Sequence, residues 1–249
     1  MNIAPLPARL RPLLASVAAL ACVHVVAAPT RAQPRAHAKQ FTADLGAERC
    51  SFTDVGRNAY FVLEPGHQLR LAGETRRGYV EVTATVLTET RLVDGVLTRV
   101  VEEVERVDGT VTGITRLFHA MCVETNDAYV FGVETTLPTD GDDGGTAQPA
   151  SWMAGRDGAR PGIAMPGRFM LGARYQLEQA PGVALDRAEN VEMHISVDTP
   201  AGRFEDCVAT IETSPLEPSE EALVIHAEGI GRVVDEELRL IGWTPGVTQ

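Results

Sequence analysis

Residues 79–121 read YVEVTATVLTETRLVDGVLTRVVEEVERVDGTVTGITRLFHAM, and this stretch decides the fold. At its start, four apolar residues alternate with glutamate and threonine: Val80, Val82, Ala84 and Val86. A period of two is typical of a strand with one buried and one solvent-facing side. The stretch therefore begins with a half-buried β-strand.

Two Asp-Gly pairs, at residues 94–95 and 108–109, interrupt the stretch. Asp-Gly between two β-rich runs favours a tight hairpin turn. The phase of the run at 97–107 is ambiguous, which indicates a β-bulge. The pattern continues over 110–121 and 128–135, so we expect consecutive antiparallel strands.

The second half of the chain repeats the pattern. Val191, Met193, Ile195 and Val197 alternate with polar residues, and Pro200-Ala201-Gly202 predicts a turn into another strand. No stretch predicts a helix of three turns. The sequence thus predicts an all-β fold, an antiparallel meander that forms a sandwich or a partly open barrel, in a single domain over 46–249.

Residues 136–172 depart from the strand pattern because they are rich in glycine and proline. A structureless loop of this length is uncommon inside a domain and is often functional. We interpret it first as a lid whose Trp and Met side chains plug the sheet. The alternative is a loop that grips a ligand through Trp152, Arg156, Asp157 and Arg160. The acidic run Asp140–Gly145 lacks the order of a calcium-binding loop and reads as a surface turn.

The N-terminus has the features of an export signal. Arg9 and Arg11 precede an apolar run at 12–21, too short for a membrane span. We expect a signal peptide over 1–32, a flexible tail over 33–45, and a periplasmic or secreted protein. A lipid anchor on Cys22, within a loose lipobox at 19–22, is the disfavoured alternative.

The charge excludes several classes of function. The chain has 22 Lys and Arg against 34 Asp and Glu, a formal net charge of −12. Such a surface repels nucleic acid and anionic membranes. Lys39 is the single lysine and lies in the expected tail, which argues against lysine-based catalysis. No phosphate-binding glycine loop precedes a helix, so we expect no nucleotide and no other cofactor.

Cysteine use fits an oxidising compartment. Cys22 belongs to the signal, and Cys207 shares its strand side with Ala209 and Ile211, as a buried small apolar residue does. This leaves Cys50 and Cys122 as the expected disulfide pair.

Three segments carry recognisable motifs: Asn58–Gly66 (NAYFVLEPG), Ser151–Pro166 (SWMAGRDGARPGIAMP) and Thr199–Cys207 (TPAGRFEDC). They resemble the N-x-Y-F-x-L-x-P-G opening, the G-x-D-G-A-R-P-G-I-x-M-P loop and the P-A-G-x-F-x-D-C turn of a widespread family of exported bacterial proteins without an established activity. The resemblance covers about Asn58 to Leu240. It implies an all-β fold like the curved half-barrels of periplasmic lipoprotein carriers.

The resemblance also bears on the expected pocket. The family usually has aromatic residues where this chain has 117–120 and Ala128. If such residues line a pocket, the pocket of this chain differs, with Tyr129 among its candidate ligand contacts.

The histidines supply the remaining candidates. His119 shares a predicted strand face with Leu117 and Met121, as a core or pocket histidine does, or as a general base in a concave site. Glu192 with His194, and His226 with Glu228, are i, i+2 pairs. If their two strands paired, the four residues would form a metal site, although a solvated charged face gives the same pattern.

Three functions follow as hypotheses. The first is a non-enzymatic exported protein whose concave sheet binds a small apolar or amphipathic ligand, or an envelope protein. The second is a metal-dependent or other hydrolase with its site under the 136–172 loop. The third is a structural envelope module. The chain has no Gly-x-Ser-x-Gly motif, and Cys122 and His119 would face opposite sides of a strand.

Overall fold

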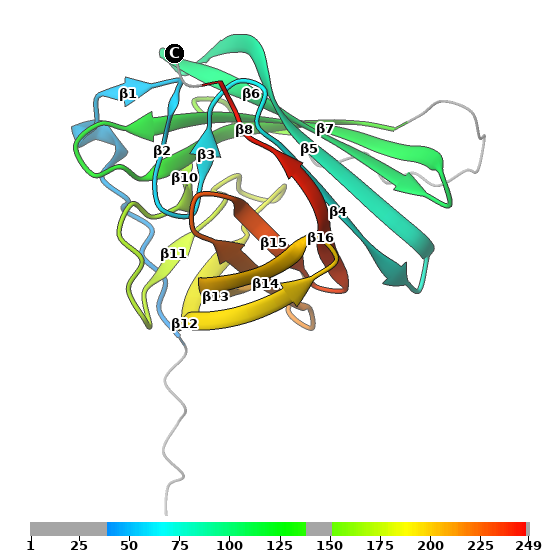
Figure 1. Cartoon of the computed structure of the whole chain (residues 1–249). Coiled ribbons are helices and arrows are strands. Elements are labelled where there is room, and N and C mark those ends of the chain that lie inside the picture. The colour runs from blue at the N-terminus through cyan, green and yellow to red at the C-terminus, as the bar shows by residue number, and fades with distance from the viewer. Residues whose placement is uncertain (1–38, 138–150, 248–249) are drawn as a thin grey trace, which may run out of the picture. The chain divides into compact units, whose positions relative to one another are not determined.

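A 14-stranded antiparallel sheet dominates the structure (Figure 1). The computed structural model describes residues 39–137 and 151–247. The strands follow one another in the order β10-β8-β7-β6-β5-β4-β16-β15-β14-β13-β12-β11, with β1 beside β7 and β9 beside β8. The short strands β2 and β3 form a separate pair. The all-β prediction is confirmed.

The elements have the following bounds: a 3-10 turn at Ala47–Arg49, then β1 Phe52–Thr53, β2 Gly56–Arg57, β3 Val62–Leu63, β4 Gln68–Thr75, β5 Gly78–Val93, β6 Val96–Val107, β7 Thr110–Cys122, β8 Ala128–Thr136, β9 Trp152–Met153, β10 Gly162–Met165, β11 Arg174–Gln176, β12 Arg187–Thr199, β13 Gly202–Thr213, β14 Glu221–Ala227, β15 Gly231–Asp235 and β16 Leu238–Thr244.

The two Asp-Gly pairs form the hairpin turns between β5, β6 and β7. Asp94 and Gly95 have φ of 48° and 79°, and Asp108 and Gly109 have φ of 48° and 83°. Positive φ at both central residues matches the right-handed twist of the flanking strands. Bulges shift the register between Val86 and Thr90 of β5 and within the Glu105-Arg106 step of β6.

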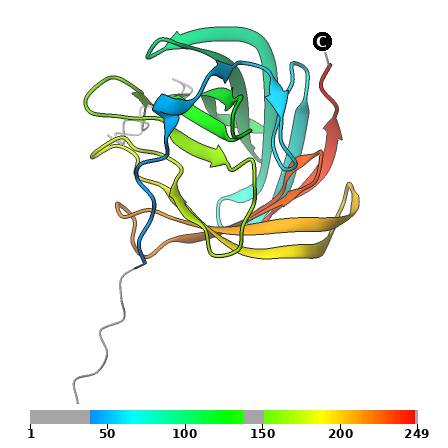
Figure 2. The same ribbon diagram turned by 90° about the vertical axis from the view of Figure 1, so that its left-hand side faces the viewer.

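The sheet curls until its two ends approach each other. Strands β12–β14 lie opposite β5–β8, as both views show (Figure 2). At the seam, the Arg160 amide donates to the Gln179 carbonyl at 3.0 Å. A side chain at Gly162 would place its Cβ 1.9 Å from the Leu177 carbonyl oxygen, so only glycine permits this approach. The sheet is not closed, and the architecture is a partly open barrel.

Part of the 136–172 segment is strand, which corrects the expectation of one long structureless loop. Met153 of β9 pairs with Gly132 of β8, and β10 pairs with the other half of β8. Trp152 and Met153 are buried in the largest apolar cluster, as the lid interpretation expects. Residues 138–150, with the acidic run, lie outside the described residues, as do the expected signal peptide and Cys22.

Residues 39–45 pack on the domain, although the sequence suggested a tail over 33–45. The Thr42 amide donates to the Arg174 carbonyl at 3.0 Å. The Arg187 guanidinium lies 4.4 Å from the centroid of the Phe41 ring. These contacts fix the chain along β11 and β12. Residues 33–38 of the expected tail lie outside the described residues.

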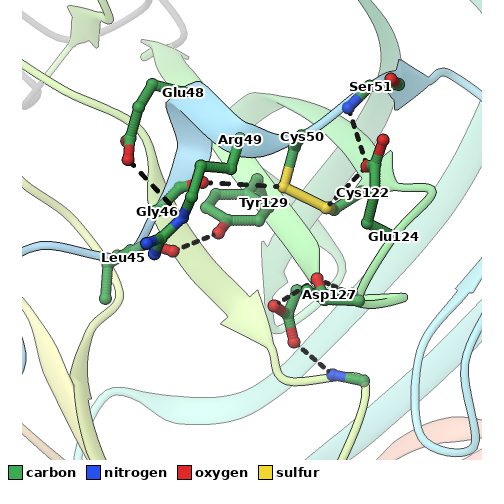
Figure 3. The surroundings of a disulfide bond; sticks show 12 residues. Leu45, Gly46, Glu48, Arg49, Cys50, Ser51, Cys122, Glu124, Asp127 and Tyr129 are labelled. Carbon is green, nitrogen blue, oxygen red and sulfur yellow. Dashed lines mark hydrogen bonds and ion pairs between the residues drawn. A yellow bond between two sulfur atoms is a disulfide. The ribbon is translucent and has the colours of Figure 1, made fainter.

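A disulfide joins Cys50 to Cys122, the pair expected from the sequence (Figure 3). It links the segment before β1 to the end of β7. The Tyr129 hydroxyl donates to the Leu45 carbonyl at 2.7 Å beside it, and the Ser51 amide donates to Glu124 at 2.8 Å. The remaining cysteine of the described residues, Cys207, is unpaired and buried. The N-terminal segment is thereby tied to the sheet by covalent and polar contacts.

Candidate functional site

A cavity of about 340 Å³ lies inside the curled sheet. Much of its wall is apolar and comes from consecutive strands β4 to β8: Leu69, Ala84, Val86, Val101, Leu117 and Val130. These residues face inward because the period of two places alternate side chains on the concave side. The volume is at the lower end of the range for small-molecule sites, roughly 300–1,000 Å³.

One end of the cavity is charged. Arg232 of β15 donates from Nη2 to Glu103 Oε1 of β6 at 2.5 Å, and from Nη1 to Asp235 Oδ2 at 2.8 Å. A quarter of the Arg232 side-chain surface is accessible (24%), and the residue lines the cavity. The ion pair between Arg232 and Glu103 connects β15 with β6 across the interior of the curled sheet, whereas the pair between Arg232 and Asp235 lies within β15.

Three further carboxyl groups line the same cavity: Glu178, Asp186 and Glu212. Burial, followed by the charge of Asp235, raises the pKa of Glu212 to about 7. Burial also raises the pKa of Glu178 to about 7, and the nearby Asp186 acts in the same direction. Five carboxyl groups thus share the cavity with one guanidinium. The site has an excess of negative charge that partial protonation reduces.

Two neutral histidines also line the cavity. The Nδ1 atom of His119 lies 3.1 Å from the Tyr129 carbonyl oxygen, so it carries the proton and Nε2 is the acceptor. Burial lowers the pKa of His119 to about 4. Burial and the charge of Arg232 lower the pKa of His226 to about 3, and its Nδ1 has no partner among the described residues. Each neutral ring retains one acceptor nitrogen.

The four loop residues proposed from the sequence as ligand contacts lie in different parts of the structure. Trp152 is 6% exposed and donates from Nε1 to Glu178 Oε1 at 3.0 Å, so it supports the cavity from behind. Arg156 and Asp157 are exposed and line a separate pocket of about 260 Å³ together with Trp152. Arg160 is exposed and donates to the Gln179 side chain at 3.0 Å. None of these four residues lines the larger cavity.

The two candidate ligand contacts on strands, His119 and Tyr129, also lie in different surroundings. His119 lines the cavity, as the pocket interpretation expects. Tyr129 is buried (1% exposed) and points its hydroxyl to Leu45 near the disulfide. It is therefore a core residue, not a ligand contact.

The structure does not assemble the proposed metal site. Strand β13 separates β12 from β14, so the strands that carry the two histidines do not pair. His194 is exposed, has φ of 56° at an irregular step of β12, and lies 3.3 Å from Asp206. His226 instead faces the cavity.

Glu192 and Glu228 are exposed and join neither histidine in a metal-binding group. Among the described residues, the one cluster with metal-ligand spacing is Cys50, Cys122 and Glu124. Its two sulfur atoms are bonded to each other, so they are not thiolate ligands.

The charged residues of the cavity were not recognised from the sequence. Glu103 shares a strand face with Val101, and Glu212 shares one with the buried Thr210. An acidic residue on the same strand face as buried residues is a pattern that is visible in the sequence and that indicates an inward-facing carboxyl group. The convergence of Glu103, Glu212 and Arg232 depends on strands that are distant in the chain, which no local pattern specifies.

The comparisons with known proteins identify no family. No protein-family model matches the chain, and no curated protein matches it. Among solved structures, a candidate lipoprotein of Parabacteroides distasonis ATCC 8503 is similar over 76% of this chain and 100% of its own. The TM-score is 0.37 and the identity 10%, so this likeness supports no conclusion about family, anchoring or function. Among the described residues, no helix is long and apolar enough to cross a membrane.

Proposed function

We propose that this protein is an exported binder of a small amphipathic molecule, held in the cavity inside the curled sheet. The observation that carries this proposal is the cavity itself, with an apolar wall along β4–β8 and a charged end around Arg232. A mostly apolar pocket with a few converging polar groups is the usual form of a small-molecule site.

Export is part of the proposal. The disulfide between Cys50 and Cys122 supports an oxidising compartment, since cytosolic thiols are kept reduced. The expected signal peptide over 1–32 agrees with this, as does the resemblance of the chain to an exported bacterial family. We favour a free protein over one anchored through Cys22.

The proposal is tested by binding of an apolar fluorescent probe, N-phenyl-1-naphthylamine, to the purified domain. We expect saturable binding to one site with an increase in emission. The variant Ala84→Phe places a ring in the cavity, because Ala84 lines it. This variant should lose the probe while it keeps a cooperative thermal transition.

The matched control is Thr83→Phe, on the same strand but on the opposite face. Thr83 does not line the cavity. The Thr83→Phe variant should therefore bind the probe as the parent does. Absence of saturable binding to the parent, or equal binding to Ala84→Phe, would overturn the proposal.

A second candidate function is acid–base catalysis in the same cavity. Burial raises the pKa of Glu178 and Glu212 to about 7, the range in which a carboxyl group acts as a general acid or base. The cavity is lined by no serine, threonine, cysteine or lysine of the described residues. A bound ligand recovered with unchanged mass after incubation would favour binding alone. Conversion that Glu212→Gln abolishes would favour catalysis.

A further inference from the structure

The cavity offers many hydrogen-bond acceptors and few uncommitted donors. Glu178, Asp186 and Glu212 contribute carboxyl oxygens, and among the described residues Glu212 has neither an ion-pair nor a hydrogen-bond partner. The guanidinium of Arg232 already donates to Glu103 and Asp235. A ligand head that donates hydrogen bonds and carries a positive charge therefore complements the excess of carboxyl groups at this end.

Two histidines add polar atoms to the cavity wall. His119 lines the cavity and is 5% exposed. Its Nδ1 is directed to the Tyr129 carbonyl, and its Nε2 has no hydrogen-bond partner among the described residues. His226 also lines the cavity, and its Nδ1 is buried without a partner among the described residues. A buried polar atom without a partner is costly, so a partner delivered by a ligand would stabilise the site.

The two polar ends are separated by an apolar middle. In the β6–β7 ladder, His119 is level with Arg99, whereas Glu103 is four residues further along β6. At about 3.3 Å per residue this is a separation of roughly 13 Å along the strands. Val101 and Leu117 are register partners between the two levels, and both line the cavity. The site therefore accommodates a molecule whose polar head lies at the charged end and whose apolar body lies along this middle.

We propose that the ligand is an amphipathic cation, a primary amine or guanidine that carries an apolar group. Its charged head lies among Glu178, Asp186 and Glu212, and its apolar body lies against Val101 and Leu117. This inference rests on the proposed binding function and adds the chemical class of the ligand. An anionic amphiphile, such as a fatty acid, would place its carboxylate against five carboxyl groups with one committed arginine.

The raised pKa values of two carboxyl groups are consistent with this ligand. Burial raises the pKa of Glu178 and Glu212 to about 7. Protons therefore offset part of the negative charge of the cavity near neutral pH. An ammonium group would take over this role and donate hydrogen bonds as well.

The test compares three ligands with the same eight-carbon chain: octylamine, octan-1-ol and octanoate. Each displaces N-phenyl-1-naphthylamine from the parent domain at pH 8. We expect octylamine to bind at least 10-fold more tightly than octan-1-ol, and octanoate to bind most weakly. In Glu212→Gln, octylamine should lose at least 10-fold in affinity, whereas octan-1-ol should change by less than 2-fold.

Glu205→Gln is the matched control, since it makes the same charge change on β13 at an exposed position. It should leave all three affinities within 2-fold. Three results would overturn the ligand class without contradicting the binding function. These are equal binding of octylamine and octan-1-ol, tighter binding of octanoate, and equal effects of the two glutamine variants. Failure of the parent to bind the fluorescent probe or any of the three ligands would overturn both.

Discussion

At the residue scale, Glu212 is the most informative side chain of the cavity. It is an acid enclosed among Glu178, Asp186 and Asp235, with Arg232 as the one nearby positive group. Because burial and like charges disfavour its ionised form, its pKa rises from 4.5 to about 7. Between pH 4.5 and about 7, Glu212 therefore keeps its proton in the folded protein and loses it in the unfolded chain.

This shift predicts how Glu212→Gln changes stability with pH. Between pH 4.5 and 7 the native state binds more protons at this position, so its contribution to the free energy of unfolding falls as the pH rises. Glutamine has no proton to lose. The stability of Glu212→Gln relative to the parent should therefore rise between pH 5 and pH 8, by on the order of 2 kcal/mol.

Urea unfolding at a series of pH values measures this difference. The lowered pKa values of His67, His119 and His226 make stability rise with pH below about pH 6.5, but this effect is common to both proteins and cancels. A difference that does not change with pH would contradict the raised pKa of Glu212.

Trp152 supports the cavity through its bond to Glu178. Trp152→Phe keeps an aromatic ring and removes the N–H donor, which leaves a partly buried carboxyl oxygen of Glu178 without its partner. We expect a loss of about 1–3 kcal/mol in the free energy of unfolding. Trp243→Phe is the control, since Trp243 is 41% exposed, and should change stability by less than about 0.5 kcal/mol. Equal effects of the two substitutions in urea unfolding would contradict the role of the Trp152 bond.

At the scale of elements, the contact of β9 with β8 depends on Gly132. A Cβ at this position would lie 2.7 Å from the Trp152 carbonyl oxygen and 2.6 Å from Met153 Sδ. The short strand β9 thus packs on β8 at a point where a side chain does not fit. This contact holds Trp152 in place behind the cavity.

Gly132→Ala should therefore destabilise the domain by about 1–3 kcal/mol and displace Trp152. Gly113→Ala on the neighbouring strand β7 is the control, because its Cβ would meet nothing within 4 Å. It should be neutral or slightly stabilising, since glycine is costly in a strand interior. Thermal unfolding followed by tryptophan emission measures both effects, and an unchanged emission maximum in Gly132→Ala would contradict the displacement.

The disulfide is the second connection at this scale. Its cysteines are 72 residues apart in sequence. In the chain-entropy model, a closed loop of this length contributes about 4 kcal/mol by restricting the unfolded chain. Cys50→Ala with Cys122→Ala, and the parent in reductant, should both lose stability of this order in urea unfolding. A double variant as stable as the oxidised parent would refute this contribution.

The elements differ in how far the sequence predicts them. The hairpins at Asp94 and Asp108 follow from local turn chemistry and strand alternation, so they are predictable. Strand β9 has two residues, too few for a periodic pattern, so the 136–172 segment reads as a loop. The strands of His194 and His226 do not pair, because strand neighbours are set by the whole sheet, in which β13 intervenes.

At the scale of the whole molecule, the site exists because the sheet curls. Glu103 and Arg232 belong to strands on different parts of the sheet path and meet only across its interior. The sequence predicts an acidic all-β protein with a concave face and points to His119. The carboxyl cluster could not be predicted, because it depends on the curvature and on the register at each bulge.

The most direct test of the proposed binding role is native mass spectrometry of the protein purified from its native cells. The released small molecules are compared between the parent, Thr83→Phe and Ala84→Phe. We expect an amphipathic organic molecule to be released from the parent and from Thr83→Phe, and none from Ala84→Phe. An equal load on Ala84→Phe, or no released molecule from any of the three, would contradict a ligand-binding role for the cavity.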